Sequence, residues 1–264
     1  MRLKLHISPC PNDTFMFDAL VNGRIDTGSL RFEVEYHDIE ELNRGAGLGR
    51  ADISKISCAV LPAIAEHYVL LDSGAALGRG NGPLLVRRAG DTRPIRRVAV
   101  PGLHTTANAL MGKLFPEIEE ETHGLALIIA HDSPTAVEQF AFVLQNVCDR
   151  QEGRFVYRER ELELVADLGQ LWEHRTALPL PLGGIAARRS LPDEVRHEAE
   201  RLLRTSIEYA FTHPEASRTY IKQHAQELDD KVIDAHIALF VNGYSLSLGD
   251  EGRRAIEALT GVIP

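Results

Sequence analysis

Residues 3–21, LKLHISPCPNDTFMFDALV, combine an alternating apolar run, a turn with two prolines and an apolar helical pattern. The alternation over 3–7 predicts a β-strand, and the pattern that begins at Phe15 predicts a helix. Residues 8–14 join them with prolines and with side chains of the kind that cap helices. A strand that passes through a short turn into a helix is the repeating unit of an α/β fold.

The same alternation of strands and helices continues through the first third of the chain. Strands are expected at 30–36, 51–57 and 68–71, and helices at 39–44 and 58–66. Strands that alternate with helices imply a mostly parallel sheet covered by helices on both faces.

The second part of the chain repeats this pattern and then becomes helical from Pro192 onward. The order predicts two α/β lobes with mixed, mostly parallel sheets. One lobe comprises 1–90 plus 188–264, and the other comprises 91–187. The further expected elements are strands at 97–100, 125–130, 163–166 and 185–188, helices at 107–115 and 133–144, and C-terminal helices at 214–226, 229–241 and 250–260.

Composition limits the classes of function. The 264 residues carry a net charge of -9, and no basic patch of the kind that binds nucleic acid is visible. No apolar run is long enough to cross a bilayer, and the N-terminus lacks the apolar region of a secretory signal. We therefore expect a cytoplasmic protein with a small-molecule ligand, no nucleic-acid partner and no membrane partner.

Cysteine and histidine spacing gives no sign of a metal or a disulfide framework. Cys10, Cys58 and Cys148 show no CxxC spacing, and the eleven histidines show no HExxH spacing. We expect no metal. The histidines in predicted helices, His236 among them, are expected at the surface or at helix ends.

Residues 74–83, GAALGRGNGP, form a glycine-rich stretch. It lacks the lysine of a Walker phosphate loop and does not open a helix. We interpret it as a crossover between the two lobes.

Three predicted strand ends carry small polar residues, at 8–14, 55–57 and 102–106. In α/β folds, ligands lie beyond the carboxyl ends of strands. Thr105 and Thr106 follow a glycine and open a predicted helix, which suits an anion such as a carboxylate. The structural alternative is that one of these threonines is only a helix N-cap.

The other polar residues at these ends also have structural explanations. Asp13 or Thr14 could cap the following helix, Lys55 could extend to solvent at a strand edge, and Asn43 lies near a helix end. In the functional alternative, these side chains face a ligand. The candidate substrate contacts are Asn12, Asp13, Asn43, Lys55, Ile56, Ser57, Thr105 and Thr106.

Residues 8–15, SPCPNDTF, form an unusual string that resembles the start of the 1,4-dihydroxy-6-naphthoate synthases of the futalosine route to menaquinone. The similarity continues through 55–57, 74–83 and 101–107, and it covers nearly the whole chain except about 117–151. The later matching segments are 153–157, 167–169, 172–173, 178–183 and 241–246.

The resemblance implies a two-lobed, periplasmic-binding-protein-like fold with the active site between the lobes. It implies a lyase that splits cyclic dehypoxanthine futalosine into 1,4-dihydroxy-6-naphthoate and a sugar-derived fragment, without a cofactor. It also implies that 55–57 and the pair Thr105-Thr106 contact a substrate carrying a carboxylate. In the family, a histidine in a motif of the form I-H-E-x-R-F is the base.

Here that motif reads RQEGRF at 150–155, with Gln151 in the place of the histidine. Glutamine cannot act as a general base near neutral pH. Either the segment 117–151 has diverged, with His131 or Glu152 as a substitute base, or it is translated from a shifted reading frame. Both explanations predict an impaired enzyme.

Two other functions compete with this interpretation. Chorismate dehydratase is a sister enzyme of similar fold in the same pathway, and the string PCPNDT at 9–14 disfavours it. A cytoplasmic small-molecule-binding protein without catalytic activity is the second, because a fold does not determine a function.

Overall fold

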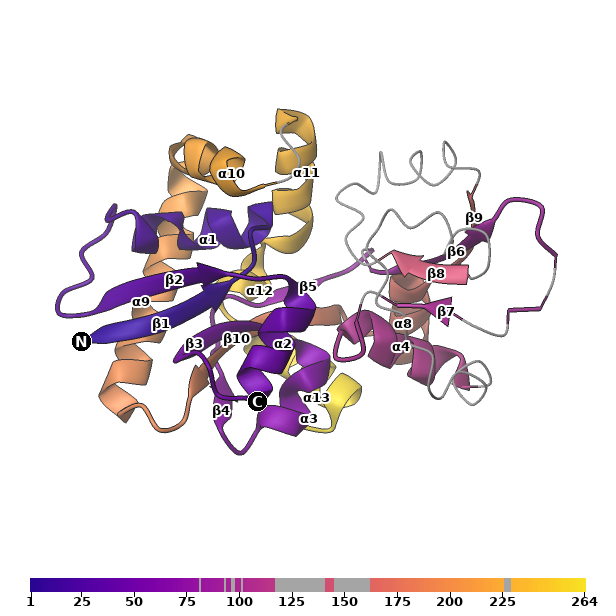
Figure 1. Cartoon of the computed structure of the whole chain (residues 1–264), viewed down its shortest axis with the longest axis horizontal. Helices are drawn as coiled ribbons and strands as arrows, with labels where there is room; N and C mark the ends of the chain where they lie inside the picture. The colour runs from indigo at the N-terminus through magenta and orange to yellow at the C-terminus, as the bar shows by residue number, and fades with distance from the viewer. Residues whose placement is uncertain are drawn as a thin grey trace. The chain divides into compact units, whose positions relative to one another are not determined.

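The chain forms two compact units in the computed structural model. Unit 1 comprises Met1–Gly78 and Pro181–Pro264, and unit 2 comprises Arg79–Leu180. Unit 2 is thus an insertion into unit 1, as the chain colours in Figure 1 show. The structure describes residues 1–80, 82–92, 94–95, 98–100, 102–116, 141–144, 162–225 and 229–264.

Unit 1 is built on a mixed sheet. Its strands are β1 (Arg2–Ile7), β2 (Arg31–Tyr36), β3 (Ile53–Ser57), β4 (Tyr68–Leu70), β5 (Ala76–Gly78) and β10 (Leu180–Arg188). Their order is β2-β1-β3-β10-β4, with β5 paired to β10. β1 is parallel to β2 and β3, whereas β10 is antiparallel to β3 and β4. Parallel neighbours place the carboxyl ends of β1, β2 and β3 at one edge of the sheet.

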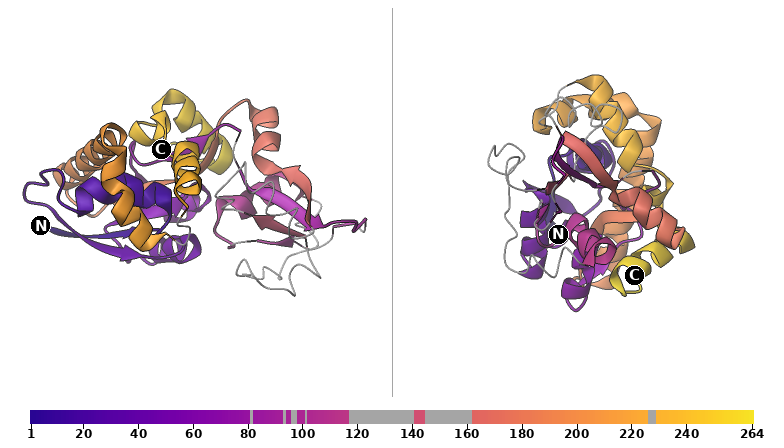
Figure 2. Two further views of the ribbon diagram at one scale, coloured as in Figure 1. Left: turned by 90° about the horizontal axis from the view of Figure 1, so that it is seen from above. Right: turned by 90° about the vertical axis from the view of Figure 1, so that its right-hand side faces the viewer.

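Helices cover this sheet on both faces. In the view of Figure 1, α1, α10 and α11 lie above the sheet, and α2, α3 and α13 group below it. Figure 2 shows α9 and α10 beside α1 from a second direction. The helical segments of unit 1 are α1 (Pro11–Val21), α2 (Ile39–Gly47), η1 (Cys58–Val60), α3 (Leu61–Ile64), α9 (Asp193–Thr212), η2 (Pro214–Ser217), α10 (Arg218–His224), α11 (Asp230–Phe240), α12 (Gly243–Leu246) and α13 (Gly249–Thr260).

The alternation of β1 decides which residues enter the core. Leu3, Leu5 and Ile7 are fully buried and pack in one cluster with apolar residues of α1 and α9. Ser206 links α9 to α1, since its hydroxyl donates a hydrogen bond to the carbonyl of Met16 at 2.7 Å. α1 is buried over almost its whole length, as is typical of a helix held between a sheet and other helices.

Unit 2 carries a second mixed sheet in the order β7-β8-β6-β9. β7 is parallel to β8, and β6 is antiparallel to both β8 and β9. Arg175 of α8 contacts the end of α4, because its guanidinium donates to the carbonyls of Lys113 and Leu114 at 3.1 and 3.2 Å. The elements are β6 (Leu84–Arg88), β7 (Val98–Ala99), α4 (Thr106–Leu114), β8 (Ala141–Leu144), β9 (Leu162–Asp167) and α8 (Leu168–Thr176).

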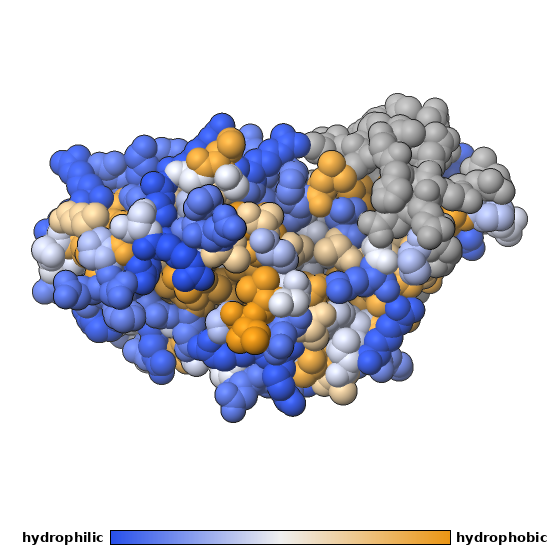
Figure 3. Space-filling view, turned by 90° about the horizontal axis from the view of Figure 1, so that it is seen from below, coloured by the Kyte–Doolittle hydropathy of each residue, from blue (hydrophilic) through white to orange (hydrophobic). Residues whose placement is uncertain are grey.

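Hydrophilic side chains dominate the surface of unit 1 in Figure 3, with hydrophobic side chains visible between them. Large exposed hydrophobic residues in the described part of the chain include Leu48, which follows α2, and Phe211, which lies in α9. Within that same part, no helix has both the length and the apolar character that a membrane span needs.

The predicted α/β architecture with mixed sheets is confirmed, but the boundaries between lobes are corrected. Residues 84–88 were expected in the first lobe and form β6, which pairs with β8 and β9 of unit 2. Residues 185–187 were expected in the second lobe and pair with β3 or β4 of unit 1. Both sheets also hold more antiparallel pairing than predicted. Strand pairing sets these features, and a local pattern carries no information about pairing partners.

Two local predictions are wrong. Residues 141–144, AFVL, were expected at the end of a helix and form β8. So short an apolar run is compatible with both the helical and the strand periodicity, and the sequence pattern cannot separate the two. The first helix begins at Pro11 and not at Phe15, since proline is favoured in the first turn of a helix. The predicted strand at 125–130 lies outside the described residues.

Gly183 in β10 gives a test of this packing. A Cβ atom at Gly183 would lie 2.7 Å from the carbonyl oxygen of Ile56 and 3.3 Å from Cε of Lys55. Gly183→Ala should force β10 away from β3 and lower the free energy of unfolding by about 1–3 kcal/mol, as measured by urea denaturation. Gly47→Ala is the control, because a Cβ atom there meets nothing within 4 Å. Equal stability of the two variants would contradict the prediction.

Candidate active site at the ends of strands β1 and β3

Asp13 is the centre of a buried polar network just beyond the carboxyl end of β1. One carboxylate oxygen accepts from the backbone N–H and the hydroxyl of Ser8, at 3.1 and 2.7 Å. The other accepts from Asn12 Nδ2 at 2.9 Å and from Lys55 Nζ at 2.7 Å. The side chain of Asp13 is fully buried. Four donors surround this carboxylate, as a buried charge requires.

Lys55 reaches Asp13 from β3, the strand next to β1 in the sheet. Its ammonium group forms an ion pair with the carboxylate, and its side chain is 7% exposed. The alternative in which Lys55 extends to solvent at a strand edge is therefore wrong. Removing one partner of a buried pair typically costs about 3–5 kcal/mol, because the other charge is left without a partner.

The capping explanation for Asp13 and Thr14 is also wrong. The N-cap of α1 is Cys10, and no side chain caps this helix. The hydroxyl of Thr14 donates to the carbonyl of Cys10 at 3.0 Å. Asp13 still lies in the first turn, where the helix dipole favours a negative charge.

Asn43 and Ser57 form a second pair that joins α2 to the end of β3. Asn43 Nδ2 donates to the Ser57 hydroxyl at 3.0 Å, and the Ser57 N–H donates to Asn43 Oδ1 at 2.8 Å. Both residues are buried, so Asn43 is more than a residue near a helix end. Ile56, which precedes Ser57 in β3, is fully buried, and its contact with a substrate stays a prediction.

His236 of α11 belongs to the network, although the sequence suggested a surface or capping role. Its side chain is buried, and Nε2 lies 3.0 Å from Asn12 Oδ1. The Asn12 amide nitrogen donates to Asp13, so the Asn12 oxygen accepts and Nε2 of His236 carries the proton. Nδ1 is then unprotonated, and it is buried without a hydrogen-bond partner.

The position of His236 was visible in the spacing of α11. Ile233 and Phe240 are buried and lie three residues before and four residues after His236. Residues at these spacings share one face of a helix, so the apolar pattern places His236 on the buried face. Spacings typical of metal ligands do not include this pattern, which is a signal of burial.

Burial determines the protonation state of His236. It lowers the pKa of the imidazole to about 4, and the negative charge of Asp13 offsets only part of this effect. His236 is therefore neutral near pH 7. Burial also raises the pKa of the Cys58 thiol to about 12, so this cysteine remains protonated.

Thr105 and Thr106 open α4 in unit 2, and both are fully buried. The hydroxyl of Thr105 accepts from the N–H of Asn108 at 3.3 Å and donates to the carbonyl of Gly102 at 2.8 Å. The N-cap alternative is thus confirmed for Thr105. The expected carboxylate site at these threonines stays a prediction, as does the role of Gln151. Gln151 lies outside the described residues, together with His131 and Glu152.

Residues 3–263 match the family model described as menaquinone biosynthesis (VitK2_biosynth). The chain belongs to this family. It is 43% identical to a 1,4-dihydroxy-6-naphthoate synthase of Thermus thermophilus, over 97% of this chain and 92% of the relative. It is 40% identical to a synthase of the same name from Streptomyces coelicolor, over 97% of this chain and 91% of that relative. The resemblance inferred from SPCPNDTF and the later motifs is confirmed.

Solved structures support the fold class. A crystal structure of a protein from Archaeoglobus fulgidus superposes with a TM-score of 0.82 at 30% identity, over 98% of this chain and 95% of that one. A Candida albicans protein described as having the generic periplasmic binding protein fold gives a TM-score of 0.67 at 13% identity, over 100% and 92%. The periplasmic-binding-protein-like fold class is confirmed.

The lowered pKa of His236 predicts how the stability of this protein depends on pH. Its folded-state pKa is about 4 and its ordinary value is 6.5. The unfolded chain therefore binds the proton first as the pH falls. Stability should decrease from pH 6.5 down to about pH 4, by roughly 3 kcal/mol from this residue. Urea denaturation at a series of pH values measures this slope.

His236→Gln keeps an N–H donor for Asn12 and removes the titrating ring, so it should flatten the slope between pH 4 and 6.5. His67→Gln, at an exposed position, is the control and should leave the slope unchanged. An identical slope in parent and His236→Gln proteins would show that His236 does not titrate in this range.

Proposed function

We propose that this chain is a carbon–carbon lyase that converts cyclic dehypoxanthine futalosine to 1,4-dihydroxy-6-naphthoate in menaquinone biosynthesis. The observation that carries the proposal is the similarity, over nearly the whole chain, to two 1,4-dihydroxy-6-naphthoate synthases. The substrate is a small carboxylate, and the reaction takes place in the cytoplasm. It needs a proton acceptor and a site for the carboxylate, and neither requires a cofactor.

The network around Asp13 supports a role in holding the substrate. It lies at the carboxyl ends of parallel strands, which is where α/β folds bind ligands. Asn12 is held by its hydrogen bonds with Asp13 and His236, and Asn43 and Ser57 hold each other, so these polar groups are already oriented. An ammonium group carries three donor hydrogens, and the ion pair of Lys55 with Asp13 uses one of them.

In this proposal Lys55, Ser57, Asn12 and Asn43 contact the substrate. Asp13 acts through its neighbours, because its two oxygens are occupied by Ser8, Asn12 and Lys55. Its role is to fix the Lys55 ammonium and the Asn12 amide. The neutral imidazole of His236 is not assigned as the base, since a pKa of about 4 makes it a weak proton acceptor at neutral pH.

Thr105 and Thr106 are proposed to bind the substrate carboxylate at the N-terminus of α4, where backbone N–H groups and the helix dipole favour an anion. Replacing both with valine should weaken binding of 1,4-dihydroxy-6-naphthoate at least about tenfold, given the strength of charge-assisted hydrogen bonds. Calorimetry measures the affinity. Loss of the Thr105 cap should also lower the free energy of unfolding by about 1 kcal/mol.

Thr212→Val, on the exposed end of α9, is the control for a lost hydroxyl. Thr105→Ser keeps the cap and should bind nearly as the parent does. Unchanged affinity in the folded double variant would rule out a carboxylate site at this helix end.

The proposal predicts low turnover, because the resemblance to the family aligns Gln151 with the histidine base. Loss of one general base typically lowers the rate by about 10² to 10⁴. Product formation from cyclic dehypoxanthine futalosine, followed by chromatography, should fall short of the Thermus thermophilus synthase by this factor. Gln151→His should restore little, since the preceding segment also departs from the family pattern.

Sequencing the gene across 117–151 separates divergence from a shifted reading frame. Binding of product without turnover would favour a binding protein that has lost its activity. Turnover equal to that of the Thermus thermophilus synthase would show that Gln151 does not stand in the position of the base, or that another residue replaces it.

A further inference from the structure

Two neighbouring strands bring His6, Glu35 and His37 together on one face of unit 1. His6 of β1 and Glu35 of β2 are partners in the parallel register. His37 follows Glu35 by two residues, and its N–H still donates to the carbonyl of Ile7 at 3.1 Å. Because side chains alternate along a strand, all three point away from the face that carries Leu5 into the core.

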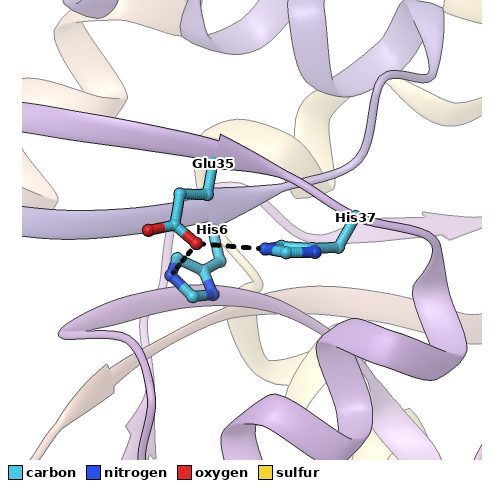
Figure 4. A group of neighbouring side chains, drawn as sticks. All are labelled: His6, Glu35 and His37. Atoms are coloured by element: carbon cyan, nitrogen blue, oxygen red, sulfur yellow. Dashed lines mark hydrogen bonds and ion pairs between the residues drawn. The ribbon is translucent and has the colours of Figure 1, made fainter.

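The donor atoms of these three residues have the spacing of metal ligands. Glu35 Oε2 lies 3.4 Å from His6 Nε2 and 3.3 Å from His37 Nε2. Figure 4 shows the Glu35 carboxylate between the two imidazole rings, and one ligand atom of each residue lies within 4.8 Å of the others. Ligands of a tetrahedral zinc ion, at about 2.0–2.2 Å from the metal, are about 3.3–3.6 Å apart.

His6 supplies the second, independent observation. Its side chain is more than nine-tenths buried, yet Nε2 points toward Glu35 and has no hydrogen-bond partner. A buried polar atom without a hydrogen bond is destabilising, and a bound cation would satisfy it.

The surroundings of the cluster fit a site that is open to solvent on one side. The Glu35 and His37 side chains are 56% and 34% exposed, whereas His6 is buried. Nδ1 of His37 faces a carboxylate oxygen of Glu41 at 3.6 Å. A carboxylate behind a histidine ligand orients the ring and raises its basicity. The positive charges of Lys4 and Arg50 lie nearby and oppose cation binding.

We propose that His6, Glu35 and His37 form a zinc site that joins β1 to β2, with water in the remaining coordination position. Two histidines and one carboxylate, with water in the fourth position, are an established ligand set for zinc. The site is separate from the lyase reaction and stabilises the edge of the sheet. Metal motifs such as HExxH lie within one segment of the sequence. This site forms between two segments, so no such motif marks it.

The test uses the full chain without a histidine tag, stripped of metal with a chelator and titrated with zinc chloride in a calorimeter. We expect one ion per chain. Glu35→Gln and His37→Gln should each weaken zinc binding at least about tenfold. Mutation of a group that only hydrogen-bonds to a metal ligand typically lowers the metal affinity about 10- to 100-fold, and loss of a ligand itself should lower it at least as much. Cobalt in place of zinc should give the visible absorption of a tetrahedral site.

Two matched controls exist on the same molecule. Glu33→Gln removes a carboxylate of similar exposure from the same face of β2, and His67→Gln removes an exposed imidazole outside the cluster. Both should bind zinc as the parent does. Absence of binding at one ion per chain, or affinity unchanged by Glu35→Gln and His37→Gln, would overturn the proposal.

Discussion

The ion pair between Asp13 and Lys55 is the interaction on which the rest of the candidate site depends. Its 2.7 Å contact joins the first turn of α1 to β3. Two buried charges are tolerated only when each finds partners that replace water. Asp13 finds them in Ser8, Asn12 and Lys55, and this requirement fixes where each of these groups points.

The network also ties together parts of unit 1 that are far apart in the sequence. Asn12 receives a hydrogen bond from His236 of α11, and the end of β3 is held by Asn43 of α2. A shift of α11 would break the bond to Asn12, and a shift of α2 would break the bonds to Ser57. Each of the two polar clusters is therefore held in place, which is what a site needs in order to orient a substrate before reaction.

Much of this was predictable from the sequence, and the parts that were not have a common cause. The strand at 3–7, the strand ends with polar residues and the family resemblance were all read from contiguous residues. The pairing of strands could not be read in this way. β6 belongs to unit 2 because it pairs with β8 and β9, and nothing within 84–88 indicates those partners. The cluster around Glu35 was missed because it forms between two segments, whereas the burial of His236 could be inferred from the apolar spacing of its own helix.

The insertion of unit 2 into unit 1 has a consequence for synthesis of the chain. β1, β3 and α1 leave the ribosome early, but β10 and α9, which complete the sheet and cover its core, follow only after the whole of unit 2. The apolar side chains of β1 and α1 therefore remain without their final packing partners in the nascent chain until unit 2 has been synthesised. Exposed apolar surface of this kind promotes aggregation, so the first half of unit 1 is the segment of this protein that a ribosome-associated chaperone would need to shield.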